Sequence, residues 1–181
     1  TAVKRKYSLP DKYILSVGTI QGRKNQKAIV EAIALLPPQE RLPVILVGNG
    51  KKYLNELMQL ADRLEVEVQV IPKVKFKDLP CIYQEATIFI YPSIVEGFGI
   101  PVLEAMASKV PVITSRDTSM AEIIQNDECL ISATNKEELS QKIQAFLLGD
   151  NEERVHRAYE RSSAFSQEKF AQELVKIYET I

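Results

Sequence analysis

Two glutamates, Glu96 and Glu104, stand eight positions apart in the stretch EGFGIPVLE and are well suited to chemistry. Gly97 and Gly99 lie between them and let the backbone approach a ligand closely, because glycine has no side chain. Pro101 fits the first turn of a helix, where its missing N–H costs nothing. The stretch therefore predicts a glycine loop that runs into a helix.

Free backbone amides at the start of that helix could bind an anion. The amides of Phe98, Gly99 and Ile100 would have no partner within the helix. Two carboxylates would repel a phosphate that bound there by itself. Glu96 and Glu104 could instead accept hydrogen bonds from sugar hydroxyls while the amides hold the phosphate. We therefore expect a ligand that carries both groups.

Helix capping is the alternative role for Glu96, because Ser93 stands three residues before it. A helix capped in this way would contain Gly97, Gly99 and Pro101. We therefore favour the ligand-binding interpretation.

A second unusual loop, Gly18 to Asn25 (GTIQGRKN), begins with Gly18 and Thr19 and ends in adjacent cations. Arg23 and Lys24 stand just before a predicted helix, where charge-assisted hydrogen bonds to a phosphate or diphosphate are strong. A solvated basic turn is the alternative interpretation of this loop.

Other nucleotide-binding signatures are incomplete or absent. The loop Gly48 to Lys52 (GNGKK) has Tyr53 where a third glycine should stand, so we interpret it as a tight turn rather than a dinucleotide fingerprint. The sequence has no P-loop motif and no pair of aspartates with metal-binding spacing. We therefore predict no metal, and assign the charge of a diphosphate to Arg23, Lys24 and the helix amides.

Short apolar runs alternate with helical patterns along the chain, which is typical of repeated βαβ units. The fold class is therefore α/β, a doubly wound Rossmann-like parallel sheet of about six strands. In the strand order 3-2-1-4-5-6, the loops after strands one and four flank the point where ligands bind, and these are the two loops described above. The predicted strands are Tyr13–Val17, Val44–Val47, Val66–Ile71, Thr87–Tyr91, Pro111–Thr114 and Cys129–Ile131. The predicted helices are Gln26–Leu36, Tyr53–Leu64, Asp78–Glu85, one ending near Ser108, Lys136–Leu148, Asp150–Ser163 and Ser166–Ile181.

The chain divides into three parts. Residues 1–10 are polar and predict a connecting segment. Residues 11–165 hold the predicted ligand-binding domain. Residues 166–181 predict a terminal helix with an apolar face.

Composition indicates an ordinary globular chain of 181 residues, 45% hydrophobic and 26% charged. The 23 basic and 24 acidic side chains nearly cancel, which argues against a nucleic-acid partner. No apolar run is long enough to span a membrane. Cys81 and Cys129 have no zinc-type spacing and predict small buried residues of a cytoplasmic chain.

The stretch from Glu96 to Glu104 resembles the double-glutamate signature of retaining GT-B glycosyltransferases of group 1 (family 4). The order SVGTIQGRKN, LVGNG, ATIFIYPSIVEGFGIPVLEAMAS, VPVITS and FSQEKFAQELVKIYE resembles that family over nearly the whole chain. The likeness is to the C-terminal, donor-binding half. The N-terminal half of such enzymes carries the acceptor site, and the helix at 166–181 resembles the one that crosses back onto it.

The resemblance assigns a role to each matching residue. It implies that Glu96 holds hydroxyls of the donor sugar and Glu104 accepts hydrogen bonds from the ribose. It implies that Lys24, with Arg23, neutralises the diphosphate. The backbone of Val74 would meet the base.

The remaining donor-binding positions come from the two loops. The resemblance implies contacts to phosphate and sugar from the backbone of the glycine loop, at Gly97, Phe98, Gly99 and Ile100. The loop after the first strand contributes Gly18 and Thr19. Many members of the family have arginine where Thr19 stands, and Arg23 is the candidate to replace it.

The implied reaction is metal-independent transfer of a hexose from a nucleotide diphosphate sugar to an acceptor hydroxyl, with retention. Arg23, Lys24 and Asn25 resemble the same stretch in mannosyltransferases of surface-polysaccharide assembly, which points to GDP-mannose. The acceptor would be a glycan or lipid-linked molecule bound by the N-terminal half, and membrane association on the inner face is left open. The alternatives are a GT-B-type sugar-nucleotide epimerase, a non-catalytic nucleotide-sugar binding module, and an α/β domain without a site.

Overall fold

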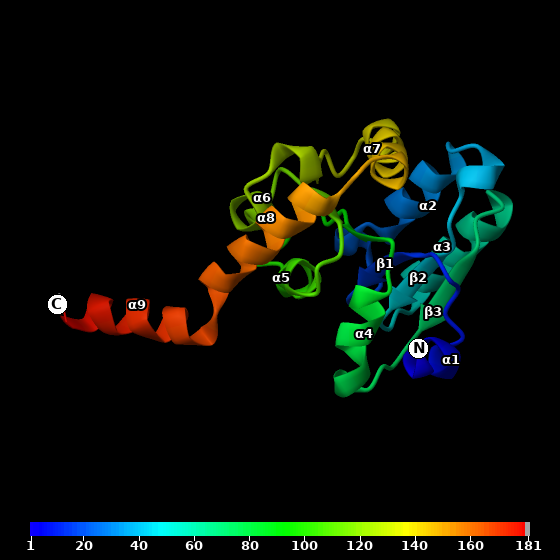
Figure 1. The fold of residues 1–181 in the computed structure, drawn as a ribbon. Coiled ribbons are helices and arrows are strands. Elements are labelled where there is room, and N and C mark those ends of the chain that lie inside the picture. The colour runs from blue at the N-terminus through cyan, green and yellow to red at the C-terminus, as the bar shows by residue number, and fades with distance from the viewer. Residues whose placement is uncertain (180–181) are drawn as a thin grey trace.

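The computed structural model describes residues 1–179, which form a parallel sheet with helices on both faces (Figure 1). The sheet order is β3-β2-β1-β4-β5-β6, as predicted, and each pair of neighbouring strands is parallel. The strands are β1 (Ile14–Val17), β2 (Val44–Val47), β3 (Val68–Ile71), β4 (Ile88–Tyr91), β5 (Val112–Ser115) and β6 (Leu130–Ile131).

The inner strands form the core of the molecule. Every residue of β1, β2, β4 and β5 is buried, because helices cover both faces of the sheet. The edge strand β3 is only partly buried until Ile71. Tyr13, Tyr83, Phe89 and Tyr91 are among the largest fully buried side chains.

The helices form two layers (Figure 1). In one layer α2 contacts α3 and α7, and in the other α5 contacts α4, α6 and α8. The helices of these layers are α2 (Gln26–Ala34), α3 (Lys52–Arg63), α4 (Leu79–Gln84), α5 (Ile100–Ala107), α6 (Ser119–Ile124), α7 (Lys136–Leu148) and α8 (Glu152–Ser162). The chain also forms single 3-10 turns, η1 (Gly22–Lys24), η2 (Pro38–Glu40), η3 (Phe76–Asp78), η4 (Asp127–Cys129) and η5 (Ser163–Phe165).

The predicted strands are confirmed, with differences at their ends. The third strand begins at Val68 rather than Val66, because Glu65 has a left-handed backbone (φ 54°) and the Val66 amide bonds to the carbonyl of Ala61. The sixth strand loses Cys129 to η4, which Asn126 caps. Cys129 is buried as expected, whereas Cys81 is partly exposed.

The ends of β1 and β2 approach each other closely. A side chain at Gly48 would place its Cβ 2.1 Å from the carbonyl oxygen of Gly18, and Gly48 has φ 149°. Only glycine fits such a contact. The GNGKK loop is therefore a tight strand-to-helix turn, as predicted, and leads into α3 at Lys52.

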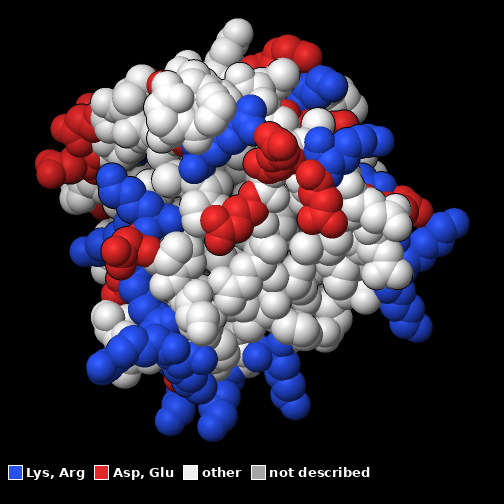
Figure 2. All heavy atoms as spheres, turned by 90° about the vertical axis from the view of Figure 1, so that its right-hand side faces the viewer, with Lys and Arg blue, Asp and Glu red and all other residues white. Residues whose placement is uncertain are grey.

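The segment 1–10 contains a short helix, α1 (Ala2–Tyr7), none of whose residues is buried. Tyr7 donates a hydrogen bond to Asp78 (2.9 Å), and Lys6 pairs with the same carboxylate. Figure 2 shows Lys and Arg side chains gathered along the lower end of the molecule, the level at which Figure 1 places α1. The last turn of α1 holds Lys4, Arg5 and Lys6.

The terminal helix α9 (Gln167–Glu179) extends away from the sheet (Figure 1). Its apolar side chains are exposed, Phe170 by 70% and Leu174 by 41%. The predicted helix runs on to Ile181, but residues 180–181 lie outside the described part of the chain. Within residues 1–179, no helix combines the length and apolar character needed to cross a membrane.

Candidate functional site

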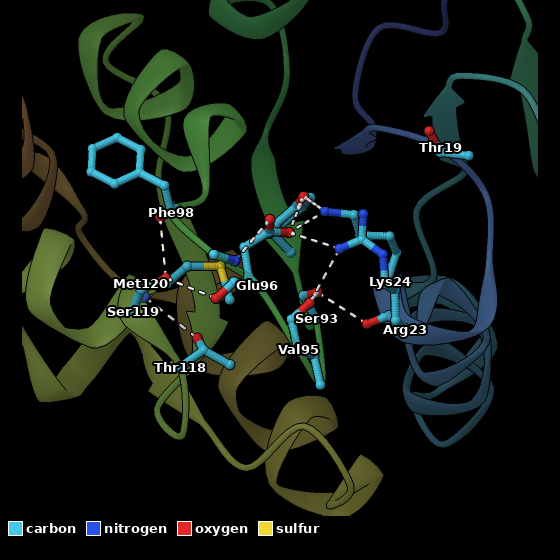
Figure 3. A network of polar contacts seen from close by, with 12 residues as sticks. Thr19, Arg23, Lys24, Ser93, Val95, Glu96, Phe98, Thr118, Ser119 and Met120 are labelled. Carbon is cyan, nitrogen blue, oxygen red and sulfur yellow. Dashed lines mark hydrogen bonds and ion pairs between the residues drawn. The ribbon is translucent and has the colours of Figure 1, made fainter.

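The two loops singled out in the sequence meet at the carboxyl end of the sheet. β1 and β4 are neighbours in the sheet, and the chain leaves them toward helices in different layers, α2 and α5. Lys24, from the loop after β1, forms an ion pair with Glu96, from the loop after β4 (Figure 3). The predicted switch-point site therefore brings together these two side chains.

Lys24 is buried within the cluster, although lysine side chains usually lie in solvent. It ends the 3-10 turn η1, and Asn25 follows with a left-handed backbone (φ 56°). Only 6% of Lys24 is exposed. Its Nζ donates to Glu96 Oε2 and to the hydroxyl of Tyr91, and lies 4.8 Å from the centre of the Tyr91 ring. A buried ammonium with these partners is a preorganised cation.

Glu96 lies between three donors. Its Oε2 accepts hydrogen bonds from Lys24 and from the hydroxyl of Tyr91 (2.9 Å). Its Oε1 accepts the amide of Gly97 (3.3 Å). Burial raises the pKa of Glu96, but the hydrogen bonds from Lys24 and Tyr91 outweigh it and hold the pKa below its usual value. Glu96 is therefore a carboxylate at neutral pH.

Arg23 lies at the rim of the same cluster. Its guanidinium is 3.8 Å from Glu96 Oε2 and donates to the carbonyl of Val95 (3.3 Å). Half of the Arg23 side chain is exposed, against 8% for Lys24. Arg23 therefore adds positive charge at the surface, and Lys24 adds it within the site.

The loop before Glu96 is tied to both neighbouring segments. Ser93 Oγ lies 3.0 Å from the carbonyl oxygens of both Arg23 and Val95. The amide of Ile94 also donates to the Arg23 carbonyl (2.8 Å). Ser93 is thus a tether between the loops, and the capping-box alternative is wrong because the residues after it are not helical.

Ser119, at the start of α6, supports the loop from the other side. Its hydroxyl donates to the carbonyl of Glu96 (3.2 Å) and lies 3.4 Å from that of Phe98 (Figure 3). The sequence interpretation missed both serines as loop supports. Their contacts are to backbone atoms and leave no pattern in the sequence.

The glycine loop enters α5 as expected. Gly99 has φ 92°, and α5 begins at Ile100. Within residues 1–179, no protein acceptor takes a hydrogen bond from the amides of Phe98, Gly99 or Ile100. The ring of Phe98 packs edge-on against Phe165, with centroids 6.0 Å apart. The structure therefore provides the free amides that an anion site needs.

Glu104 lies on α5, apart from the Lys24–Glu96 cluster. Its Oε2 accepts a hydrogen bond from the buried hydroxyl of Tyr83 (2.7 Å). Both residues line a cavity of about 350 Å³, together with Phe76, Leu79 and Pro80. Glu104 is therefore not part of the Lys24–Glu96 cluster but faces an adjoining, mostly apolar space.

The remaining predicted residues lie around the cluster. Gly18 has φ 139° and donates its amide to Val47. Thr19 lies apart from Glu96, and its carbonyl accepts a hydrogen bond from Gln26 (Figure 3). Val74 packs against the core in the loop after β3. Gly18, Thr19 and Val74 make no hydrogen bond or ion pair with Glu96.

Tyr91 is a side chain of the Lys24–Glu96 cluster that the sequence interpretation missed. It is the last residue of β4, so it stands at the carboxyl edge with its hydroxyl toward the loop. The sequence did offer one sign of this position, since Tyr91 is a polar aromatic residue at the end of an otherwise apolar strand. Among residues 1–179, no cluster of three or more His, Cys, Asp or Glu side chains could hold a metal ion.

The model of the family described as glycosyl transferases group 1 matches residues 2–163. The chain belongs to this family. The group 1 glycosyltransferase relatives include the O-antigen chain mannosyltransferase B of Escherichia coli, 33% identical over 99% of this chain. The chain spans about half of that relative, 49% of its length.

Solved structures show that this group 1 chain has the fold of glycosyltransferase domains. The C-terminal domain of LpcC from Francisella tularensis, a group 1 protein, has a TM-score of 0.76 and 24% identity over 91% of each chain. Anabaena HepE, solved in complex with UDP-glucose, has a TM-score of 0.84 and 20% identity, covering 99% of this chain and 52% of its own. The doubly wound domain of this chain is therefore of the GT-B type.

Proposed function

We propose that this chain is the donor-binding half of a retaining glycosyltransferase that uses a nucleotide diphosphate sugar. The observation that carries the proposal is the convergence of Lys24 and Glu96, a buried cation and a carboxylate, beside the free amides that precede α5. A cation and amides suit a diphosphate, and a carboxylate suits sugar hydroxyls. One ligand that carries both groups satisfies the whole cluster.

Lys24 and Glu96 each change partner when such a donor binds. Lys24 turns from Glu96 to a phosphate oxygen, with Arg23 adding charge at the rim. Glu96 then accepts hydrogen bonds from the sugar hydroxyls. Glu104 accepts hydrogen bonds from the ribose, and the backbone of Val74 meets the base.

The proposed transfer retains the configuration at the anomeric carbon. The bond from this carbon to the phosphate oxygen breaks, and a bond to the acceptor oxygen forms on the same face. The acceptor proton passes to the leaving phosphate. Lys24, Arg23 and the helix amides stabilise the negative charge of the departing diphosphate, so the proposal needs no metal ion.

We further propose mannose as the hexose and GDP-mannose as the donor. The support is the stretch from Arg23 to Asn25 and the name of the Escherichia coli relative. The acceptor, a glycan or a lipid-linked molecule, would bind to another domain of the full-length protein. A cytoplasmic location and peripheral membrane association stay predictions.

The first test is nucleotide binding. A nucleotide at 100 times its dissociation constant stabilises the folded protein by about 2.7 kcal/mol, which raises its melting temperature by several degrees. We expect such a rise with GDP, with or without EDTA. A larger rise with UDP would change the proposed donor, and no rise with any nucleoside diphosphate would contradict the proposal.

The second test is turnover of the full-length protein with GDP-mannose. Lys24→Ala and Glu96→Ala should each lower turnover about 100-fold or more, because each removes a contact to the reacting donor. Lys27→Ala is the matched control, since Lys27 pairs with Glu56 on α3 instead of Glu96. Near-normal turnover of either site variant would refute its role.

A further inference from the structure

A buried tyrosine lies beneath each glutamate of the EGFGIPVLE stretch. The hydroxyl of Tyr91 donates to Glu96 Oε2 at 2.9 Å, and that of Tyr83 donates to Glu104 Oε2 at 2.7 Å. Each tyrosine is only 1% exposed. Each bond engages one carboxylate oxygen and holds the side chain in one orientation.

The two tyrosine rings are fixed by the core of the sheet. The ring of Phe89 packs between them, with its centroid 5.4 Å from that of Tyr83 and 6.0 Å from that of Tyr91. All three side chains are fully buried. The positions of the two hydroxyls are therefore set by core packing, not by mobile surface groups.

Tyr91 also connects Glu96 to Lys24. Its hydroxyl accepts a hydrogen bond from Lys24 and donates one to Glu96, so both its donor and an acceptor position are used. In the proposed function Lys24 leaves Glu96 for a phosphate oxygen. Tyr91 then still donates to Glu96 Oε2, the oxygen that Lys24 has left.

We propose that Tyr91 and Tyr83 are positioning residues, which orient Glu96 toward the donor sugar and Glu104 toward the ribose. The inference rests on the proposed function, because it assigns each tyrosine to one end of the same donor. It follows that the two tyrosines act on different parts of the ligand. Through Glu96, Tyr91 acts on the sugar, whereas Tyr83, through Glu104, acts on the ribose of any nucleotide.

Both hydroxyls are protonated donors at neutral pH. Burial raises the pKa of Tyr91, and its hydrogen bond to Glu96 raises it further. Burial likewise raises the pKa of Tyr83, with the neighbouring charge of Glu104 adding to it. A phenylalanine at either position would keep the ring in the core and remove only the donor.

The test measures the affinity of the full-length protein for a nucleoside diphosphate and for its sugar, by calorimetry. The probes are GDP with GDP-mannose, or UDP with UDP-glucose, whichever pair the unchanged protein binds. We expect Tyr91→Phe to weaken the sugar nucleotide about tenfold and the bare diphosphate by less than about twofold, the loss of one hydrogen bond to a charged group. We expect Tyr83→Phe to weaken both probes by the same factor.

Tyr13→Phe is the matched control. Tyr13 is equally buried, and its hydroxyl donates to the carbonyl of Ile82 (2.6 Å), so the variant also loses a buried phenolic hydrogen bond. Tyr13 directly precedes β1, so it lies at the amino ends of the strands, whereas the site lies at their carboxyl ends. Tyr13→Phe should leave both affinities unchanged.

Two further results decide the inference. In a Glu96→Ala background, Tyr91→Phe should cause no additional loss, because its effect passes through Glu96. Equal weakening of both probes by Tyr91→Phe, or no weakening, would overturn the role of Tyr91. If Tyr91→Phe does not fold, Tyr83→Phe still tests the positioning role of the tyrosines. If Tyr83→Phe weakens the binding of neither probe, that role is overturned. Binding of neither probe pair by the unchanged protein would overturn the proposed function itself.

Discussion

The pairing of Lys24 with Glu96 allows two opposite charges to be buried together in the site. Each group lies largely out of water and would be costly to bury without a partner of opposite charge. The pair therefore links the two loops, and removal of either partner would leave the other charge buried and unpaired. In the proposed function, the pair must be broken when Lys24 takes up a phosphate, so part of the binding free energy of the donor would offset the separation of Lys24 from Glu96.

The pH dependence of stability follows from the Glu96 carboxylate. Its pKa is lower in the folded chain than its ordinary value of 4.5, so ionised Glu96 favours folding above that pH. The contribution is lost as the pH falls below about 4.5 and passes through the lower folded pKa. Glu96→Gln should therefore be less stable than the unchanged chain at pH 7, and the gap should close toward pH 3. Urea denaturation between pH 3 and pH 7 measures the free energy of unfolding of both chains. A constant difference between them across this range would contradict the prediction.

At the scale of elements, the glycine loop and α5 depend on one backbone conformation. Gly99 has φ 92° at the start of α5, in the left-handed region that other residues avoid. A Cβ at this position would lie 2.8 Å from Cγ of Met120. The two glycines of the loop are therefore not equivalent, because Gly97 has open space around it.

Replacing each glycine by alanine separates these two cases. Gly99→Ala should lower the free energy of unfolding by about 1–3 kcal/mol, the usual range for a residue forced into a sparsely populated conformation. Gly97→Ala is the matched control, and it should change stability by less than about 0.5 kcal/mol. Chemical denaturation of both variants measures the difference. Equal losses of stability in the two variants would show that the left-handed conformation of Gly99 does not require glycine.

The elements could be predicted well from the sequence, because apolar runs of Val and Ile mark buried strands wherever they stand. The strand order and the meeting of the Lys24 and Glu96 loops followed from the same βαβ pattern. The contacts that support the site could not be predicted, although the end of the fourth strand at Tyr91 was. Ser93 and Ser119 bond to backbone carbonyls, and the hydroxyl of Tyr91 reaches Glu96 only because β4 ends where it does.

At the scale of the whole molecule, α9 is the element with least support from the rest of the chain. It follows η5 and extends away from the sheet with Phe170, Leu174 and Val175 exposed. An apolar face of this kind is typical of a docking surface. The family relative is about twice as long as this chain, so we propose that another domain of the full-length protein covers α9.

Polar substitutions in α9 test this arrangement. Phe170→Ser together with Leu174→Ser should lower the melting temperature of the full-length protein by several degrees, because burial of one such side chain is worth about 2 kcal/mol. The same changes in the 181-residue chain should have little effect, since both side chains are already exposed there. Gln172→Ala serves as the control within α9. An equal response of the long and short chains would refute the docking role.

The contact between Phe98 and Phe165 has a mechanical consequence. Phe165 ends η5, directly before the segment that leads into α9, and its ring lies against the glycine loop. A displacement of α9 would therefore reach the loop beside Glu96 through this pair of rings, alongside the packing of α8 on α5. In the proposed function, movement of a second domain that holds α9 would therefore shift the glycine loop that precedes α5.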